Sequence, residues 1–309
     1  MKVIDLLNNS KDKTTISFEF IPPKKGLSKK DLILTLDPLM EYNPLFVDVT
    51  MHRNAVELVR NGSKYEGFTY QKFPSSLLVC ESIREKYDVE VVPHVICGGF
   101  SKEDTEDILL DMVYLGYQNV VALQGDKLSI EKSFTPHPEG HRYAYQLIGQ
   151  IKQLNEGISL HSNSYKSDFC IGAGCYPEKH YTLPNIEREI EVCKCKQNAG
   201  AEYFISQMCF DIDAYLTFYS NMLANNIKQV IPGIKVIANS QQIYRLPQSF
   251  YINFPEKFVH DMQIATNPTE VGVDFAVDYC NKLLNAGIKH LHFYTMNSIF
   301  LNKVLKKLL

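Results

Sequence analysis

The sequence contains no tryptophan and no run of about 18 apolar residues, which excludes a transmembrane helix. The formal net charge of the 309 residues is −3, so no basic field exists that would hold nucleic acid or an acidic membrane surface. Apolar residues make up 45% of the chain and charged residues 22%, which is typical of a folded globular protein. We therefore expect neither a nucleic-acid partner nor a membrane partner.

Cysteine is also sparse, because the 8 cysteines in 309 residues are far too few for a disulfide-stapled miniprotein. Cys170 and Cys209 lie in apolar strand patterns, which predicts free thiols that serve as small core residues in a reducing cytosol. A zinc site would depend on Cys193 and Cys195, but their short spacing inside a predicted helix and the absence of a second pair argue against it. The first residues lack the apolar core of a secretory signal, so we expect a cytoplasmic protein and no metal.

Short β-branched or aromatic runs alternate with longer helical patterns along the chain. Eight strands are predicted, at Thr14–Phe20, Leu45–Met51, Val89–Ile96, Asn119–Leu123, Asp168–Gly174, Glu202–Gln207, Gln229–Ile237 and Lys289–Thr295. Helices are predicted at Val3–Leu7, Ser101–Leu115, Arg142–Leu154, Asn185–Asn198, Asp211–Asn225 and Thr269–Asn285. No Pro- or Ser-rich linker divides the chain, and no G-x-G-x-x-G follows the first strand, which argues against a Rossmann sheet. The alternation predicts an α/β fold, a (β/α)8 TIM barrel that forms a single domain over residues 1–309.

Polar residues follow the predicted strands at their carboxyl ends, where the side chains of a barrel face the active site. They are Glu19, Thr50, His94, Gln124 with Asp126, Tyr176 with His180, Gln207, Asn239 and Tyr294.

Glu19 is the most informative of these residues because it interrupts an apolar run with a phenylalanine on either side. A partly desolvated carboxyl has a raised pKa and suits general acid catalysis. A glutamate paired with a basic residue explains the position equally well. His94 and His180 are the only histidines at predicted strand ends, and the acids around them do not form a clear metal-binding triad.

Eight short segments, in order along the chain, resemble the motifs of methylenetetrahydrofolate reductases. They are SFEFIPPK at 17–24, VDVT at 47–50, PHVIC at 93–97, VALQGD at 121–126, YPEKH at 176–180, QMCFD at 207–211, IPGI at 231–234 and HFYTMN at 292–297. The resemblance covers nearly the whole chain. It implies a barrel that binds FAD and reduces 5,10-methylenetetrahydrofolate to 5-methyltetrahydrofolate with NADH or NADPH, by a ping-pong mechanism. It also implies a homo-oligomer without the regulatory domain of the eukaryotic enzymes.

The resemblance assigns roles to individual residues. Glu19 would be the general acid that opens the imidazolidine ring of the folate, and Asp126 would stabilise the cationic iminium intermediate. Gln207 would bind the pterin and, in the other half-reaction, the nicotinamide, while Asp126 and Gln242 would be further substrate contacts. The FAD contacts would be Thr50, Met51, His94, Gln124, Gly125, Asp126, Tyr143, Ala144, Tyr176, His180, Glu189 and Lys196.

Three positions depart from the family pattern. Gln124 stands where the family usually has arginine, so we expect weaker FAD binding. Leu246 replaces a phenylalanine that often stacks on the folate, and Ser298 replaces a basic residue that contacts the glutamate tail. The segment 61–73 aligns poorly and supports no assignment.

Other functions fit the same barrel pattern. A related flavin barrel enzyme could act on another substrate, such as an imino acid. A metal-dependent lyase or hydrolase and a non-catalytic folate-binding protein are two further alternatives. A yellow, flavin-containing protein would argue against the metal-dependent enzyme.

Overall fold

The computed structural model describes residues 1–62, 64–161, 165–296 and 298–309. Parallel strands form one sheet in the order β10-β11-β1-β2-β5-β6-β7-β8-β9. Their bounds are β1 Thr15–Phe20, β2 Phe46–Val49, β5 Glu90–Ile96, β6 Asn119–Leu123, β7 Cys170–Cys175, β8 Tyr203–Ser206, β9 Val230–Ile231, β10 Gly233–Ile234 and β11 His290–Tyr294. The predicted (β/α)8 TIM barrel is confirmed.

The barrel closes at a single interrupted strand. β9 pairs with β8, and β10 pairs with β11 on the other side, while only Pro232 separates the two segments. Proline has no N–H to donate to a sheet ladder, which explains why the predicted strand Gln229–Ile237 is split here. All eight predicted strands are otherwise present.

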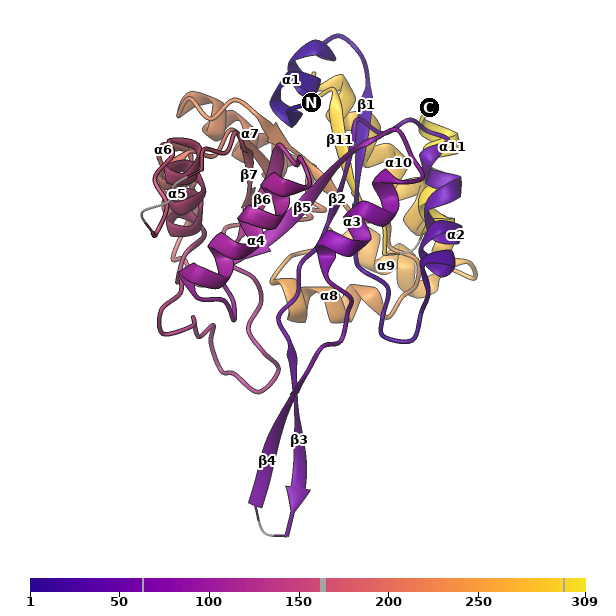
Figure 1. Ribbon diagram of the computed structural model, residues 1–309. Coiled ribbons are helices and arrows are strands. Elements are labelled where there is room, and N and C mark those ends of the chain that lie inside the picture. The colour runs from indigo at the N-terminus through magenta and orange to yellow at the C-terminus, as the bar shows by residue number, and fades with distance from the viewer. Residues whose placement is uncertain (63, 162–164, 297) are drawn as a thin grey trace.

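Helices surround the sheet (Figure 1). Their bounds are α1 Val3–Asn9, α2 Lys29–Met40, α3 Ser76–Arg84, α4 Lys102–Tyr114, α5 Ala144–Asn155, α6 Ile186–Ala199, α7 Ile212–Ala224, α8 Gln242–Phe250, α9 Glu256–Ile264, α10 Pro268–Asn285 and α11 Ser298–Leu308. Within the described part of the chain, no helix is both long enough and apolar enough to span a bilayer.

The six predicted helices all exist, with ends that differ from the prediction by one or two residues. The prediction missed α2, α3, α8, α9 and α11. Pro38 lies inside α2 and Pro247 inside α8, and an internal proline weakens the helical pattern of a sequence. The start of α2 nevertheless carries a capping box between Ser28 and Asp31, the same signal that marks the start of α4.

The barrel interior is mostly apolar. Phe46, Val92, Val121 and Tyr203 belong to one buried cluster there, and α1 contributes Val3 and Leu7 to the same cluster. The larger hydrophobic core lies between the sheet and the helices. Of the eight cysteines, all but Cys195 are buried, as expected for core thiols.

A β-hairpin projects from the barrel on the side opposite α1 (Figure 1). It consists of β3, Ala55–Asn61, and β4, Lys64–Tyr70, which pair in antiparallel register. From Glu57 onward, the described residues of both strands are exposed. The prediction missed this element, although Asn61-Gly62 is a typical hairpin turn.

Candidate active site

A cavity of about 500 Å³ opens at the carboxyl ends of the barrel strands. Apolar side chains form much of its wall, among them Ile21, Ile96, Leu123, Ile205 and Met208. The predicted site residues that line it are Glu19, Thr50, Met51, His94, Gly125, Asp126, Tyr176 and Gln207. The fold therefore brings together residues from six strands that are far apart in the sequence.

Glu19 lies near the end of β1 and faces the cavity. Burial raises the pKa of its carboxyl to about 8, and the neighbouring acids Asp48 and Asp126 act in the same direction. The buried ammonium of Lys235 acts in the opposite direction, and burial in turn lowers the pKa of Lys235 to about 8. At neutral pH, Glu19 is thus largely protonated and able to donate a proton.

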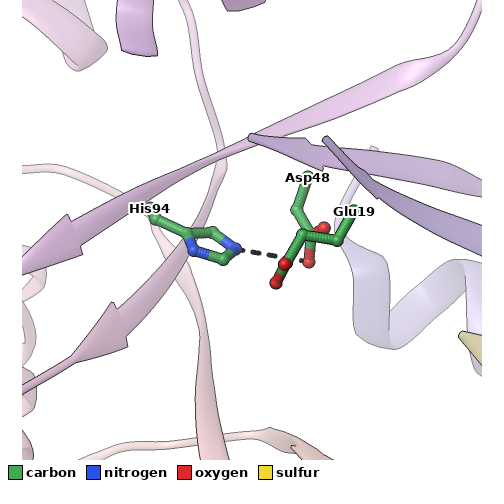
Figure 2. A group of neighbouring side chains, drawn as sticks. All are labelled: Glu19, Asp48 and His94. Carbon is green, nitrogen blue, oxygen red and sulfur yellow. Dashed lines mark ion pairs between the residues drawn. The ribbon is translucent and has the colours of Figure 1, made fainter. Parts of the chain in front are cut away.

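Asp48 on β2 lies beside Glu19, beneath the cavity. Figure 2 shows Asp48, Glu19 and His94 with their polar atoms turned toward one another. His94 Nε2 lies 3.4 Å from Asp48 Oδ2, and His292 Nε2 lies 3.7 Å from Asp48 Oδ1. Burial raises the pKa of Asp48 and lowers the pKa of both histidines. A protonated carboxyl and neutral imidazoles are therefore the favoured forms.

Glu19, Asp48 and His94 each offer one polar atom within 4.8 Å of the other two. That spacing alone would admit a small cation. The pKa of both carboxyls is raised, however, so the group favours bound protons. We assign no metal to it, and the expectation of a metal-free protein remains a prediction.

The turn after β6 forms one rim of the cavity. Gly125 has a φ of +80°, which glycine adopts without strain, and the exposed Asp126 follows it. The side chain of Gln124 is not part of the cavity wall, because its Nε2 donates to the carbonyl oxygen of Arg142 at 2.7 Å. Gln124 thus connects the end of β6 to the segment that enters α5.

The loop after β7 is held from beneath by a buried acid. Glu189 is fully buried and accepts hydrogen bonds from the backbone N–H groups of Tyr176 and His180, at 3.3 and 3.0 Å. Lys196 donates to the carbonyl oxygen of Gly174 at 2.7 Å. Glu189 therefore supports this loop and Lys196 supports the end of β7, and the direct FAD contacts assigned to them remain predictions.

The remaining predicted residues do not line the cavity. Tyr143 is 45% exposed and stacks on Tyr145 just before α5, which begins at the buried Ala144. His180 is within 2.6 Å of the hydroxyl of Thr182. Gln242, the first residue of α8, uses its Oε1 to accept from the N–H of Ala238 at 2.6 Å.

Comparison with known proteins bears directly on this site. A family model described as Methylenetetrahydrofolate reductase matches residues 3–308. The chain belongs to this family.

Relatives of the methylenetetrahydrofolate reductase family occur in bacteria and fungi. The chain is 28% identical over 289 residues to 5,10-methylenetetrahydrofolate reductase of Pectobacterium carotovorum, covering 91% of this chain and 85% of that protein. It is 27% identical over 304 residues to the Escherichia coli protein of the same name, with 95% and 91% covered. Methylenetetrahydrofolate reductase 1 of Schizosaccharomyces pombe is 28% identical over 305 residues, with 96% and 46% covered. The chain thus spans about half the length of its fungal relatives and most of the length of its bacterial relatives.

A solved structure of another protein shares the fold over nearly the whole chain. It is an uncharacterized protein from Clostridium thermocellum that binds two copies of 5-methyl-5,6,7,8-tetrahydrofolic acid. The TM-score is 0.64 at 14% sequence identity, and the alignment covers 99% of this chain and 100% of the other.

The positions that depart from the methylenetetrahydrofolate reductase family also have places in the structure. Leu246 is buried in α8, in a cluster with Met208 and Phe258. Ser298 is the first residue of α11, and Asn297 of the last motif lies outside the described residues.

Sequence reasoning missed several polar residues of the site. Asp48 and His292 lie within predicted strands, where only the residues at the carboxyl ends were considered as site residues. Lys235 also lies within a predicted strand, for which Asn239 was expected to be the site residue. Arg53 was missed as well. It pairs with Glu131 through two N–O contacts of 3.0 and 3.2 Å and joins the loops on two sides of the cavity. The available signal was that Asp48 and His292 are polar residues within otherwise apolar strands. The register that sets them beside Glu19 and Ser17 is visible only in the structure.

Proposed function

We propose that this protein reduces 5,10-methylenetetrahydrofolate to 5-methyltetrahydrofolate, with FAD as cofactor and NADH or NADPH as electron donor. The observation that carries the proposal is Glu19, a carboxyl at the wall of the barrel cavity with a pKa of about 8. Ring opening of the folate needs such an acid, since the leaving nitrogen must be protonated. The names of the bacterial relatives and the folate ligand of the Clostridium thermocellum protein support the same substrate class.

The cavity fits a flavin. Its apolar walls suit a flat aromatic ring, and the polar groups of Thr50, His94 and Asp126 stand around them. Gly125 lets the backbone approach a ligand closely at the rim. Hydride transfer from the nicotinamide to the one-carbon unit of the folate is the chemistry that FAD would supply there when bound.

The side chains of this chain would then supply orientation and proton transfer. Glu19 protonates the folate nitrogen that leaves when the ring opens. The carboxylate of Asp126 stabilises the positive charge of the iminium that results. Gln207, at the end of β8, offers an amide that can both donate and accept, so it can bind the pterin or the nicotinamide.

We propose that one cavity serves both substrates, because Gln207 in its wall can bind either and no Rossmann motif occurs in the sequence. The two substrates would therefore bind in turn, which requires ping-pong kinetics. We expect the purified protein to be yellow and double-reciprocal plots at several folate concentrations to be parallel. Intersecting lines would overturn the single-cavity mechanism. A yellow protein that does not act on methylenetetrahydrofolate would favour another substrate, such as an imino acid.

We further propose a cytoplasmic homo-oligomer in which the β3–β4 hairpin contacts a second copy of the chain. An isolated two-stranded hairpin is only marginally stable in water, and its unpaired edges invite association. Leu58, Tyr65 and Phe68 on the hairpin are 51%, 67% and 53% exposed. A contact with a second subunit would cover such side chains.

A further inference from the structure

A line of polar side chains runs through the barrel interior, from its amino-terminal end to the active-site cavity. At the amino-terminal end, Thr15 Oγ1 lies 2.8 Å from His290 Nδ1. His290 Nε2 lies 2.9 Å from Ser17 Oγ, and Ser17 Oγ lies 2.8 Å from His292 Nδ1. His292 Nε2 faces Asp48 at 3.7 Å, and Asp48 adjoins Glu19. The line therefore connects Thr15, at the start of β1, to Glu19, near its end.

The position of these groups is unusual for a barrel core. Ser17, Asp48 and His292 are each 0% exposed, while the residues around them form an apolar cluster. Burying polar groups costs free energy unless they are paired. Among the described residues, both carboxyl oxygens of Asp48 and Nε2 of His292 lack a hydrogen-bond partner. A small movement or one bridging water must therefore close the 3.7 Å between His292 and Asp48 before a proton passes.

Every member of the line can both accept and donate a proton. Hydroxyls and neutral imidazoles do so directly, and Asp48 does so in its protonated form. Thr15 and His290 are half-buried, so protons from solvent can enter at that end. Other charged or titratable groups near Glu19 are His94, Lys235, Asp126 and Tyr294, and the hydroxyl of Tyr203 is buried near Asp48.

We propose that this line is a proton relay that returns a proton to Glu19 from the amino-terminal end of the barrel. The proposal rests on the function proposed above, in which Glu19 gives one proton to the folate in each turnover. Flavin and folate would then cover the cavity face of Glu19 and keep bulk water from it. One proton enters from water at Thr15, each group passes one proton on, and one proton reaches the Glu19 carboxylate, so charge and atoms balance. Ser17, His290 and His292 are positioning residues because they act through Glu19.

Ser17→Ala tests the relay because it removes the hydroxyl between the two histidines without touching the cavity. We expect normal flavin reduction by the nicotinamide and a normal first folate turnover from protonated enzyme, followed by later turnovers slowed severalfold. Cys170→Ala is the matched control, since it also deletes one buried side-chain atom from the barrel interior. Ser17→Thr retains a hydroxyl and should restore turnover. If Ser17→Ala does not fold, Thr15→Val should give the same result, a normal first folate turnover followed by slower later turnovers.

A second measurement needs no substrate. In the wild type, the imidazole nitrogen NMR signals of His290 should change as Glu19 titrates, and in Ser17→Ala this coupling should disappear. Identical turnover and identical coupling in Ser17→Ala and Cys170→Ala would overturn the relay. A wild-type protein that shows the coupling but leaves methylenetetrahydrofolate unchanged would overturn the proposed function and support the relay.

Discussion

His94 Nε2 lies 3.4 Å from Asp48 Oδ2, and both side chains are buried, with His94 in the wall of the cavity that Glu19 faces and Asp48 beneath it. This pair places a second acid directly behind the proposed proton donor. Burial favours the neutral form of both groups. Asp48 is therefore protonated, His94 is an uncharged imidazole, and the pair carries no net charge. Glu19 can therefore hold a proton before the ring opens, and Asp126 is the acid that faces the cationic folate intermediate afterwards.

Substitution of Glu19 separates its chemical role from a structural one. Glu19→Gln keeps the shape of the side chain but cannot deliver a proton, so we expect folate reduction to fall by about 10²- to 10⁴-fold. Flavin reduction by the nicotinamide should be nearly unchanged. Rapid mixing of each half-reaction measures both rates. Equal losses in the two half-reactions would mean that Glu19 only maintains the site.

The pH dependence should differ between the two half-reactions. The pKa of Glu19 is about 8, so the acid is protonated below that pH and loses its proton above it. Folate reduction should be level below pH 8 and should fall by about tenfold per pH unit well above it. Flavin reduction by the nicotinamide should lack this decrease. A folate rate that instead rises with pH through this range would identify the Glu19 carboxylate as the active form.

The barrel interior tolerates no extra atom at Gly172. A Cβ there would lie 2.4 Å from Cζ of Tyr203, which is fully buried on the adjacent strand β8. We expect Gly172→Ala to lower the free energy of unfolding by about 1–3 kcal/mol, measured by chemical denaturation. Gly149→Ala in α5 is the control, because its Cβ would meet no described atom within 4 Å. That variant should be up to about 1 kcal/mol more stable, and equal effects at the two sites would contradict the packing described here.

The β3–β4 hairpin should affect the formation of the homo-oligomer and leave the stability of the barrel nearly unchanged. Leu58→Lys combined with Phe68→Lys places charges on exposed hairpin side chains, so we expect smaller particles by light scattering and a free energy of unfolding within about 0.5 kcal/mol of wild type. Leu78→Lys combined with Tyr114→Lys is the control, since these side chains are 67% and 88% exposed on the outer helices. An unchanged particle size in the hairpin variant would exclude the hairpin as the contact.

The sequence predicted the barrel because strand and helix patterns are local, and because eight polar strand ends converge only in a closed parallel sheet. Glu19, His94, Asp126 and Gln207 line the cavity for the same reason, and their roles remain predictions. The helices α2 and α8 were missed because each contains a proline. The hairpin was missed because its residues match no family motif, although its Asn61-Gly62 turn was visible.

The buried part of the site was harder to predict. Asp48 and His292 lie within strands, where a polar residue in an apolar run gives no sign of its partners. Their meeting depends on the register that aligns β1 with β2 and β11, which only the folded barrel defines. Lys235 was missed for the same reason. It directly follows β10, the second of the two short strands that Pro232 separates.

Anaerobic stopped-flow spectroscopy of the wild-type protein with its bound flavin tests the central claim most directly. Mixing with NADH or NADPH should bleach the flavin absorbance without any folate present. Subsequent mixing with 5,10-methylenetetrahydrofolate should restore the absorbance and produce one 5-methyltetrahydrofolate for each flavin. Flavin that stays reduced in the presence of the folate would contradict the account.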